Sequence, residues 1–451
     1  MNIVIIGLGT IGRTILGSLA SDKHTITIID ENGDKIEQLI EKYDVYGVVG
    51  NGACMDIQQE AHVKEADLVI SLTRGDEVNI LACLVAKKLG AKNTIARVRN
   101  PDYRNQMVAM REDLGLSLIV NPEREAAAEI INRINLSSVG QVEHFAKGRA
   151  LLVEVLAEPG CALVGESLLN LSKKLNHRTL ICAVQRGEEV IIPSGQFVIQ
   201  EGDRLHITSD ANFLGKFLSE MRLIKSPIRN VMIIGGSRTA YYLASGLSKK
   251  RYNIKLIERN RETADTMAEL LPHVTVVRGD GTNHDLLLEE GIESMDAFVA
   301  LTGIDEENMI VSMFANSMKV NKTITRIKNE DLYGMLGSLG IKNAVSPKFV
   351  VADRIISYIR ALDNSRGSNV LTLYRLVNNR VEALEFSAKK QEKFFDTPLK
   401  ELKLKKNCLI ACIIRKNDVI IPDGNSSIHL GDNVIVVTTH KNFTDLTDIF
   451  E

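Results

Sequence analysis

The chain repeats one stretch of its sequence after about 228 residues, and this internal duplication constrains the fold more than any other feature. The apolar run at 3–6 leads into Gly7-Leu8-Gly9-Thr10-Ile11-Gly12, and the run at 231–234 leads into Gly235-Gly236-Ser237-Arg238-Thr239-Ala240. The separation is 228 residues from Gly7 to Gly235 (235 − 7) and again from Asp30 to Glu258 (258 − 30). Two similar halves indicate a tandem duplication.

Each half is predicted to contain a large and a small domain. Short apolar strands alternate with helix-length segments over residues 1–136 and 228–362, which predicts an α/β fold with a Rossmann-like, doubly wound parallel sheet in each range. Over 140–222 and 367–451 the pattern changes to strands of period two with Pro-Gly turns, which predicts a small α+β module. We expect breaks at 225–227 and 363–368. A chain of 451 residues is long enough for four domains.

Composition narrows the classes of function. The 55 Lys and Arg residues nearly balance the 57 Asp and Glu residues, so no net field favours nucleic acid. No window holds 18 uninterrupted apolar residues and no signal-type run opens the chain, so we expect a cytoplasmic protein with no membrane insertion. The six cysteines form no CxxC pair and no zinc-ligand spacing, which favours reduced, mostly buried thiols and no metal site.

The first glycine cluster has the spacing of a nucleotide-binding turn. Gly7 permits a tight strand-to-helix turn, Gly9 lets the backbone approach a pyrophosphate, and Gly12 allows close helix packing. Thr10 and Ile11 begin the helix, whose N-terminal N–H groups favour phosphate. Asp30, at the end of the second strand, can accept hydrogen bonds from ribose hydroxyls, which favours NAD(H) or an adenosine nucleotide. The competing interpretation is that the glycines only form the turn.

The second cluster departs from this spacing. Gly235, Arg238, Thr239 and Glu258 keep the order of the first half, but Ser237 replaces the middle glycine and Ala240 the last. A side chain at Ser237 stands where the backbone is expected to approach phosphate. The second crevice is therefore predicted to bind more weakly, to bind a different nucleotide, or to be empty.

Further residues recur at an offset of 229. They follow the third, fourth and fifth strands, where a crevice for the nucleotide is expected. These candidate contacts are Gly50, Asn51, Gly52, Thr73 and Arg97 in the first half, and Gly279, Asp280, Thr302 and Arg326 in the second. The arginines could reach a phosphate. These residues could instead maintain the fold, which is the preferred interpretation for Asn79 and Asn308.

No catalytic group accompanies the crevices. None of the nine histidines lies opposite another at this offset, and neither a nucleophile elbow nor a GxxxxGK[ST] loop occurs. An oxidoreductase needs an acid, base or hydride-directing group beside the nicotinamide. A regulatory, non-enzymatic role is therefore favoured over the alternative of a soluble NAD-dependent oxidoreductase with duplicated Rossmann domains.

The order of these motifs, with Thr73-Arg74-Gly75-Asp76-Glu77-Val78-Asn79 and the Ile-Ile-Pro-x-Gly segments of the small modules, resembles the RCK family, which regulates potassium conductance. The resemblance covers essentially the whole chain as two tandem units. It implies a cytoplasmic regulatory subunit that binds NAD(H) and ATP or ADP. It also implies a homo-oligomeric ring, expected to be a tetramer, held peripherally at the membrane by a potassium-translocating subunit of the Trk type.

By the same resemblance, the helices after Pro122 and Pro347 are expected to pack against other large domains. A third possibility is a small-molecule sensor acting through the small modules. These modules could bind a ligand at their strand edges or only dimerise, and dimerisation is the favoured interpretation.

Overall fold

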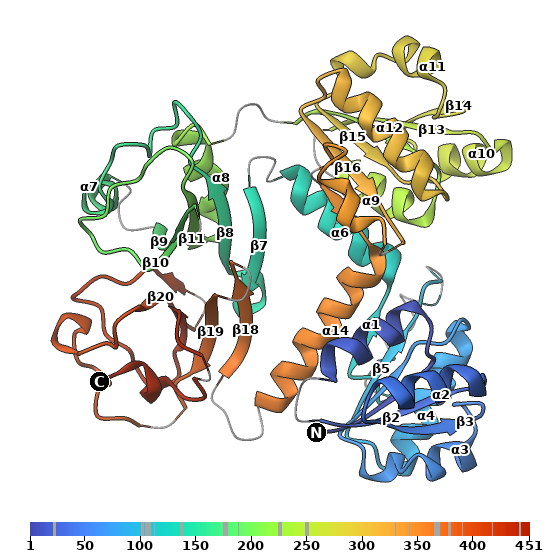
Figure 1. Ribbon diagram of the computed structural model, residues 1–451, viewed down its shortest axis with the longest axis horizontal. Coiled ribbons are helices and arrows are strands. Elements are labelled where there is room, and N and C mark those ends of the chain that lie inside the picture. Colours follow the sequence, from blue (N-terminus) through green and yellow to red (C-terminus); the bar gives the residue numbers. More distant parts are fainter. Residues whose placement is uncertain are drawn as a thin grey trace. The chain divides into compact units, whose positions relative to one another are not determined.

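The fold was obtained as a computed structural model of all 451 residues (Figure 1). It describes residues 1–20, 24–100, 103, 110–111, 113–135, 139–174, 179–187, 189–223, 228–248, 252–329, 331–341, 343–364, 370–377, 380–389, 391–416, 418–441 and 443–451. The expected break at 225–227 lies outside these residues, as do positions 365–368 of the break expected at 363–368, whereas 363 and 364 belong to the helix Pro347–Asn364.

The first large domain is a six-stranded parallel sheet in the order β3-β2-β1-β4-β5-β6, the Rossmann order that the sequence predicts. Its two central strands are apolar over most of their length, as expected of strands whose two faces are both covered. The strands are β1 (Asn2–Ile6), β2 (Thr25–Asp30), β3 (Tyr46–Val49), β4 (Leu68–Ser71), β5 (Asn93–Arg97) and β6 (Leu118–Val120). The helices are α1 (Thr10–Leu19), α2 (Gly33–Lys42), α3 (Met55–Glu60) and α4 (Asp76–Leu89).

The second large domain repeats this topology in the order β14-β13-β12-β15-β16-β17. Local signals recur as well, because the Asn260 side chain caps α10 as the Asn32 side chain caps α2. The strands are β12 (Asn230–Ile234), β13 (Asn253–Glu258), β14 (Thr275–Arg278), β15 (Ala297–Ala300), β16 (Lys322–Arg326) and β17 (Ala344–Val345). The helices are α9 (Arg238–Ser248), α10 (Arg261–Leu270), α11 (His284–Glu289), α12 (Asp305–Ser317), α13 (Tyr333–Leu336) and α14 (Pro347–Asn364).

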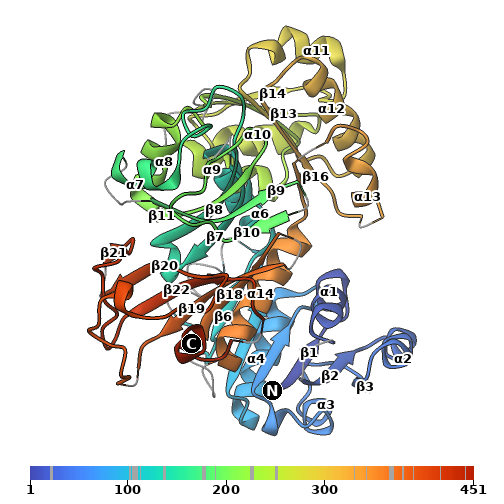
Figure 2. The ribbon, with the colours of Figure 1, turned by 60° about the vertical axis from the view of Figure 1, so that its left-hand side comes forward.

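Helix α6 (Pro122–Asn135) follows the last strand of the first sheet but packs on the second domain (Figures 1 and 2). Pro122 suits the first helical position, and the Asn121 side chain caps the helix by accepting from the Arg124 N–H at 3.0 Å. The apolar face of α6 joins the core of the second domain beside α9, through Ala126, Ala127, Ile130 and Ile134. The expectation that this helix packs against another large domain is confirmed within the chain.

Each small module is built around a five-stranded antiparallel sheet, and the two sheets share one topology. The first contains β7 (Val139–Phe145), β8 (Ala150–Leu156), β9 (Thr179–Arg186), β10 (Glu189–Ile191) and β11 (Arg204–Asp210), with helices α7 (Leu168–Lys174) and α8 (Ala211–Glu220). The second contains β18 (Val370–Leu376), β19 (Val381–Ser387), β20 (Cys408–Arg415), β21 (Asp418–Ile420) and β22 (Asn433–Thr438). The alternation of apolar and polar residues with a period of two does not by itself predict the edge strands β7 and β18.

The chain forms two compact units, and their boundary does not fall between the two halves of the duplication. One unit contains both large domains, and the other contains both small modules. Residues 1–135 and 228–356 make one unit, and 136–227 with 357–451 make the other. In the second unit the small modules share a hydrophobic core that includes Phe145 and Cys182 of the first and Leu376 and Cys412 of the second. Pairing of the small modules, the favoured interpretation, therefore takes place within one chain.

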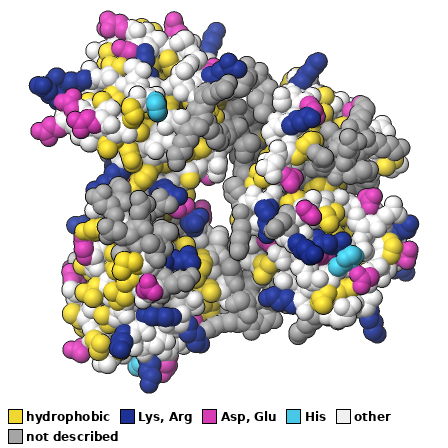
Figure 3. All heavy atoms as spheres, turned by 180° about the vertical axis from the view of Figure 1, so that it is seen from behind, with side chains coloured by type: hydrophobic (Ala, Val, Ile, Leu, Met, Phe, Trp, Pro, Cys, Tyr) yellow, Lys and Arg dark blue, Asp and Glu magenta, His cyan; other side chains and the backbone are white. Residues whose placement is uncertain are grey.

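The surface carries charges of both signs. On the face drawn in Figure 3, Lys and Arg side chains are interspersed with Asp and Glu, in keeping with the nearly balanced composition. Within the described ranges, none of the helices combines the length and the apolar character that crossing a bilayer requires.

Candidate functional site

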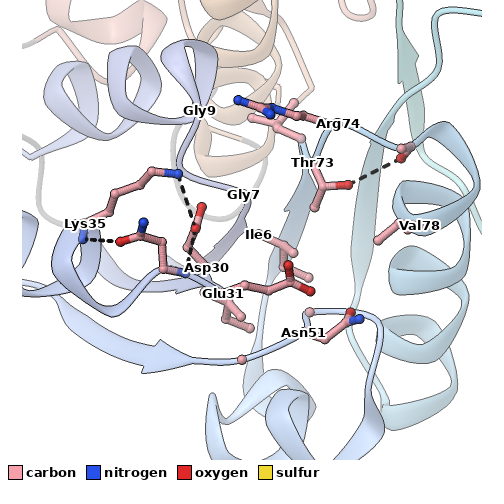
Figure 4. Close-up of a pocket in the computed structure, with 16 residues that line it drawn as sticks. Ile6, Gly7, Gly9, Asp30, Glu31, Lys35, Asn51, Thr73, Arg74 and Val78 are labelled. Carbon is pink, nitrogen blue, oxygen red and sulfur yellow. Dashed lines mark hydrogen bonds and ion pairs between the residues drawn. The ribbon is translucent and has the colours of Figure 1, made fainter.

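A crevice opens at the carboxyl ends of the strands in the first large domain, the edge where ligands bind in doubly wound sheets (Figure 4). It encloses a cavity of about 560 Å³. Seven predicted contacts line it: Gly7, Gly9, Asp30, Gly50, Asn51, Gly52 and Thr73. The strand order thus brings together residues from loops that are far apart in the sequence.

Gly7 and Gly12 make the turn at the floor of the crevice. Gly7 has φ +92°, in the left-handed region, and a Cβ there would lie 2.8 Å from the Thr73 nitrogen. A Cβ on Gly12 would collide with the Gly7 carbonyl oxygen. Gly7 is therefore constrained by the backbone at Leu72 and Thr73, and Gly12 by the backbone of Gly7. Gly12 does not itself line the cavity.

The N-terminus of α1 is free to bind an anion. Gly9 is the N-cap residue and provides no capping side chain, so the first N–H groups of the helix lack that partner. Thr10 and Ile11, which follow Gly9, supply two of these groups through the backbone. A Cβ on Gly9 would meet nothing within 4 Å. The space beside Gly9 therefore has both the room and the positive dipole end that a pyrophosphate requires.

Asp30 is held in place by the turn it faces. One carboxylate oxygen accepts from the Leu8 N–H at 2.7 Å, and the other accepts from the Asn32 N–H at 3.0 Å. Its side chain is 13% exposed and lines the cavity. A carboxylate has about four acceptor positions, so Asp30 retains capacity for a ribose hydroxyl.

Two basic side chains in the crevice are absent from the predicted contacts. The Lys35 Nζ lies 3.5 Å from the Asp30 Oδ1, and Arg74, which directly follows Thr73, also lines the cavity (Figure 4). The place of Arg74 after the fourth strand could have identified it. Lys35 lies in the first turn of α2, and nothing in its spacing distinguishes it from an ordinary surface lysine.

Thr73 and Arg97 are fixed by a buried asparagine. The Asn79 Oδ1 accepts from the Thr73 N–H at 2.7 Å, and its Nδ2 donates to the Arg97 carbonyl at 2.9 Å. Asn308 repeats these bonds to Thr302 and Arg326, at 2.8 and 3.0 Å. Both asparagines are fully buried, as a role in maintaining the fold requires. The Arg97 guanidinium donates to the Thr73 carbonyl, and its side chain does not line the cavity.

The repeated glycine loops after the third strands pack against the core. A Cβ on Gly52 would collide with the side chain of Ile6, and one on Gly281 would collide with Ile234. Asn51 accepts from the Ala53 N–H at 2.9 Å. The main cause that lowers the pKa of Asp280 is hydrogen bonding from Thr282. These turns are shaped by packing as well as by their place at the crevice.

The region predicted as the second crevice differs from the first at its helix. Ser237 precedes α9, and its hydroxyl accepts from the Ala240 N–H at 3.4 Å. In α9 a side chain of the protein therefore occupies an N–H group near the helix N-terminus. The equivalent group of α1 has no such side-chain partner. Gly235 keeps the left-handed turn, with φ +93°, and Glu258 accepts from the Gly236 N–H at 2.6 Å.

The structure also shows the surroundings of Arg238, Thr239 and Gly279, the remaining predicted contacts in the second domain. Arg238 is exposed at the start of α9, whereas Thr239 beside it is buried. The Gly279 N–H donates to the Glu258 carbonyl at 3.0 Å. A salt bridge of 3.6 Å joins Arg259 to Glu307. These charges stand where the first half has Glu31 and Val78, so the two crevices offer different surroundings to a ligand.

Two domain families match the chain, each of them twice. The TrkA-N domain matches residues 3–122 and 231–347, and the TrkA-C domain matches 152–212 and 383–451. The Trk system potassium uptake protein TrkA of Vibrio alginolyticus is 30% identical over 456 residues, covering 100% of this chain and 99% of that protein. These matches confirm the resemblance drawn from the motifs.

Solved structures share the fold. A GsuK channel bound to NAD has a TM-score of 0.62 at 19% identity and covers 98% of this chain, with 77% of that chain matched. GsuK bound to ADP has a TM-score of 0.50 at 16% identity, with 81% of this chain and 70% of that chain matched. At such identities the likeness extends to the fold alone.

Proposed function

The chain belongs to the TrkA family of Trk-system potassium uptake proteins, and we propose that it is the nucleotide-binding regulatory subunit of such a system. In this proposal it gates a potassium-translocating membrane subunit through a conformational change and carries out no chemical reaction. A ligand can shift such an equilibrium only through its different affinity for the two conformations.

The first crevice carries the proposal. An uncapped helix N-terminus faces open space beside Gly9, and Asp30 lies at the end of the second strand, so the cavity suits a nucleotide with a pyrophosphate and a free ribose. We propose NAD(H) and ATP or ADP as ligands. GsuK, which shares the fold, has been solved with NAD bound and with ADP bound, which supports both classes of nucleotide as candidate ligands. Lys35 and Arg74 would add positive charge beside the phosphates.

We also propose an oligomeric state and a cellular location, both from the family to which the chain belongs. The subunit would act at the inner face of the membrane, held there by its partner, as a homo-oligomeric ring and most simply a tetramer. We further propose the domain boundaries 1–136, 140–222, 228–362 and 367–451, since each sheet falls almost entirely within one of these ranges.

The test joins binding to flux. Calorimetric titration with NADH, NAD, ATP and ADP measures affinity, and potassium flux is measured in vesicles that hold the Trk membrane subunit with and without this protein. We expect at least one nucleotide to bind and to change the flux. Binding without any effect on flux would overturn the gating role, and no binding by any of the four would overturn the nucleotide site.

The alternative is an NAD-dependent oxidoreductase with duplicated domains. It predicts oxidation of NADH in the presence of a panel of small carbonyl compounds. Turnover that is lost with Asp30→Ala would favour this alternative over the regulatory role.

A further inference from the structure

An ion pair in the second large domain joins two positions that line the open cavity in the first. The Arg259 Nη1 lies 3.6 Å from the Glu307 Oε1. By the offsets of the duplication, Arg259 takes the position of Glu31 (259 − 31), and Glu307 takes that of Val78 (307 − 78). Glu31 directly follows β2 and Val78 belongs to α4, and both line the first cavity (Figure 4). The ion pair therefore forms a latch across a space that the first domain leaves open.

The backbone beside each end of the Arg259–Glu307 latch is held as it is in the first domain. Arg259 follows Glu258, whose carboxylate accepts from a backbone N–H of the glycine turn, as the carboxylate of Asp30 does. Glu307 precedes Asn308, whose side chain bonds to the segments that follow β15 and end β16, as its first-half counterpart does after β4 and β5. The two domains thus differ at the latch in their side chains.

The latch lies where the base of a nucleotide is expected. In doubly wound sheets the pyrophosphate lies at the N-terminus of the first helix, and the ribose lies at the acid that ends the second strand. The base then extends beyond that acid, between the residue that follows it and the loops after the third and fourth strands. In the second domain the latch crosses this space, so a base can enter only after Arg259 and Glu307 have separated.

The second domain also lacks the two basic side chains of the first crevice. Thr263 takes the position of Lys35 (263 − 35), and Gly303 takes that of Arg74 (303 − 74). Opening the latch would in addition leave the carboxylate of Glu307 facing the ligand, where the first domain has an apolar side chain. A nucleotide with two or more phosphates is strongly anionic, so these exchanges of charge oppose its binding in the second domain.

Exposure and charge set the size of the effect. The side chain of Arg259 is 63% exposed and that of Glu307 is 24% exposed, and an exposed ion pair shifts an equilibrium by about fivefold at most. Loss of one hydrogen bond between a cationic side chain and a phosphate weakens binding by roughly 10- to 100-fold. Together these losses make the second domain weaker than the first by roughly 50-fold or more.

We propose that the Arg259–Glu307 latch, together with the loss of the two basic side chains, closes the second large domain to adenine nucleotides. This inference rests on the proposed nucleotide site in the first crevice. Each chain then binds one nucleotide, and NADH and ADP compete for it. The second domain keeps the Rossmann fold without such a ligand, so the subunit responds to whichever nucleotide fills its first crevice.

Calorimetric titration of the full-length protein with NADH and with ADP tests the stoichiometry. We expect one molecule of either nucleotide per chain at concentrations up to about ten times its Kd. A graft that gives the second domain the four side chains of the first crevice should raise this number to two: Arg259→Glu, Thr263→Lys, Gly303→Arg and Glu307→Val. A Cβ on Gly303 meets nothing within 4 Å, so the fold has room for arginine there.

The matched control removes another ion pair of the same domain. Arg261 and Asp265 lie 3.7 Å apart on α10, and Arg261→Glu with Asp265→Val should leave the stoichiometry at one. The reverse experiment builds the latch in the first crevice. Glu31→Arg with Val78→Glu should raise the Kd by about fivefold, whereas Glu31→Arg alone, which cannot form the pair, should not raise it.

The proposal is overturned if the wild type binds two nucleotides per chain, or if the folded graft still binds one. An unchanged Kd after the latch is built in the first crevice would also overturn it. If the wild type binds neither NADH nor ADP, the proposed nucleotide site itself fails and this inference fails with it. The two failures are distinguishable, because the first gives two nucleotides per chain and the second gives none.

Discussion

Gly9→Ser would give the first crevice the residue that the second crevice already has. Gly9 has φ −71° and ψ −169°, an extended conformation open to any residue, and a Cβ there meets nothing within 4 Å. The fold should therefore tolerate serine, and a serine N-cap should even add a few tenths of a kcal/mol to the free energy of unfolding.

Binding should nevertheless weaken. By analogy with Ser237, the new hydroxyl would bond to the Gly12 N–H and fill the space beside α1. One lost N–H bond to a charged phosphate is worth about 1.5–3 kcal/mol. That loss corresponds to a rise in Kd of roughly 10- to 100-fold. Calorimetry measures Kd, and thermal unfolding checks the fold.

Gly337→Ser is the matched control, because Gly337 has a helical backbone and open space for a Cβ, and it lies in the second domain. The reasoning is refuted if Gly9→Ser binds nucleotide like the wild type while remaining folded. An equal loss in the control would show that the effect is not local to the crevice.

Three further predictions test the fold and its dependence on pH. Asn79→Ala should lower the free energy of unfolding by about 3 kcal/mol in urea titrations, because it leaves several buried backbone groups unpaired; a loss below about 1 kcal/mol would contradict this. Gly12→Ala should cost about 1–3 kcal/mol through its collision with the Gly7 carbonyl, although Ala240 occupies this position in the second half. Burial is the main cause that lowers the pKa of His206 from its ordinary 6.5, so the unfolded chain binds the proton first. Stability should then fall as the pH drops below about 6.5, by up to about 1.4 kcal/mol per pH unit, until the lower folded pKa is reached. His206→Ile, which copies the residue at the equivalent position of the second module, Ile435, should remove this part of the pH profile; an unchanged profile would show that other groups cause it.

The sheet order and the first crevice could be predicted because both rest on local signals. The glycine spacing and Asp30 follow from one strand-helix-strand unit, and the structure places Gly7, Gly9 and Asp30 around one cavity. Asn79, interpreted from the sequence as maintaining the fold, makes five hydrogen bonds, to Ser71, to Thr73 and to the Arg97 carbonyl.

Other features depend on contacts that one strand or helix does not encode. The pattern of α6 showed an apolar face but not that the face would be covered by α9, a contact between residues more than 100 positions apart. Strand β7 does not follow from a period of two, because its pairing with β8 shifts register between Val139 and Val142. The orientation of Arg97 towards the Thr73 carbonyl depends on the loop after β4, which the spacing alone does not describe.

The packing of α6 on the second large domain also has a consequence for synthesis and folding of the chain. Synthesis proceeds from the N-terminus, and 113 residues separate the end of α6 at Asn135 from the end of α9 at Ser248 (248 − 135). At roughly 5–20 residues per second, the apolar face of α6 has to wait about 6 to 23 seconds for the surface that covers it. For that interval the newly made first half presents an uncovered apolar helix to the ribosome exit and to neighbouring nascent chains. A holding chaperone, or a pause in translation near the linker, would act at this stage.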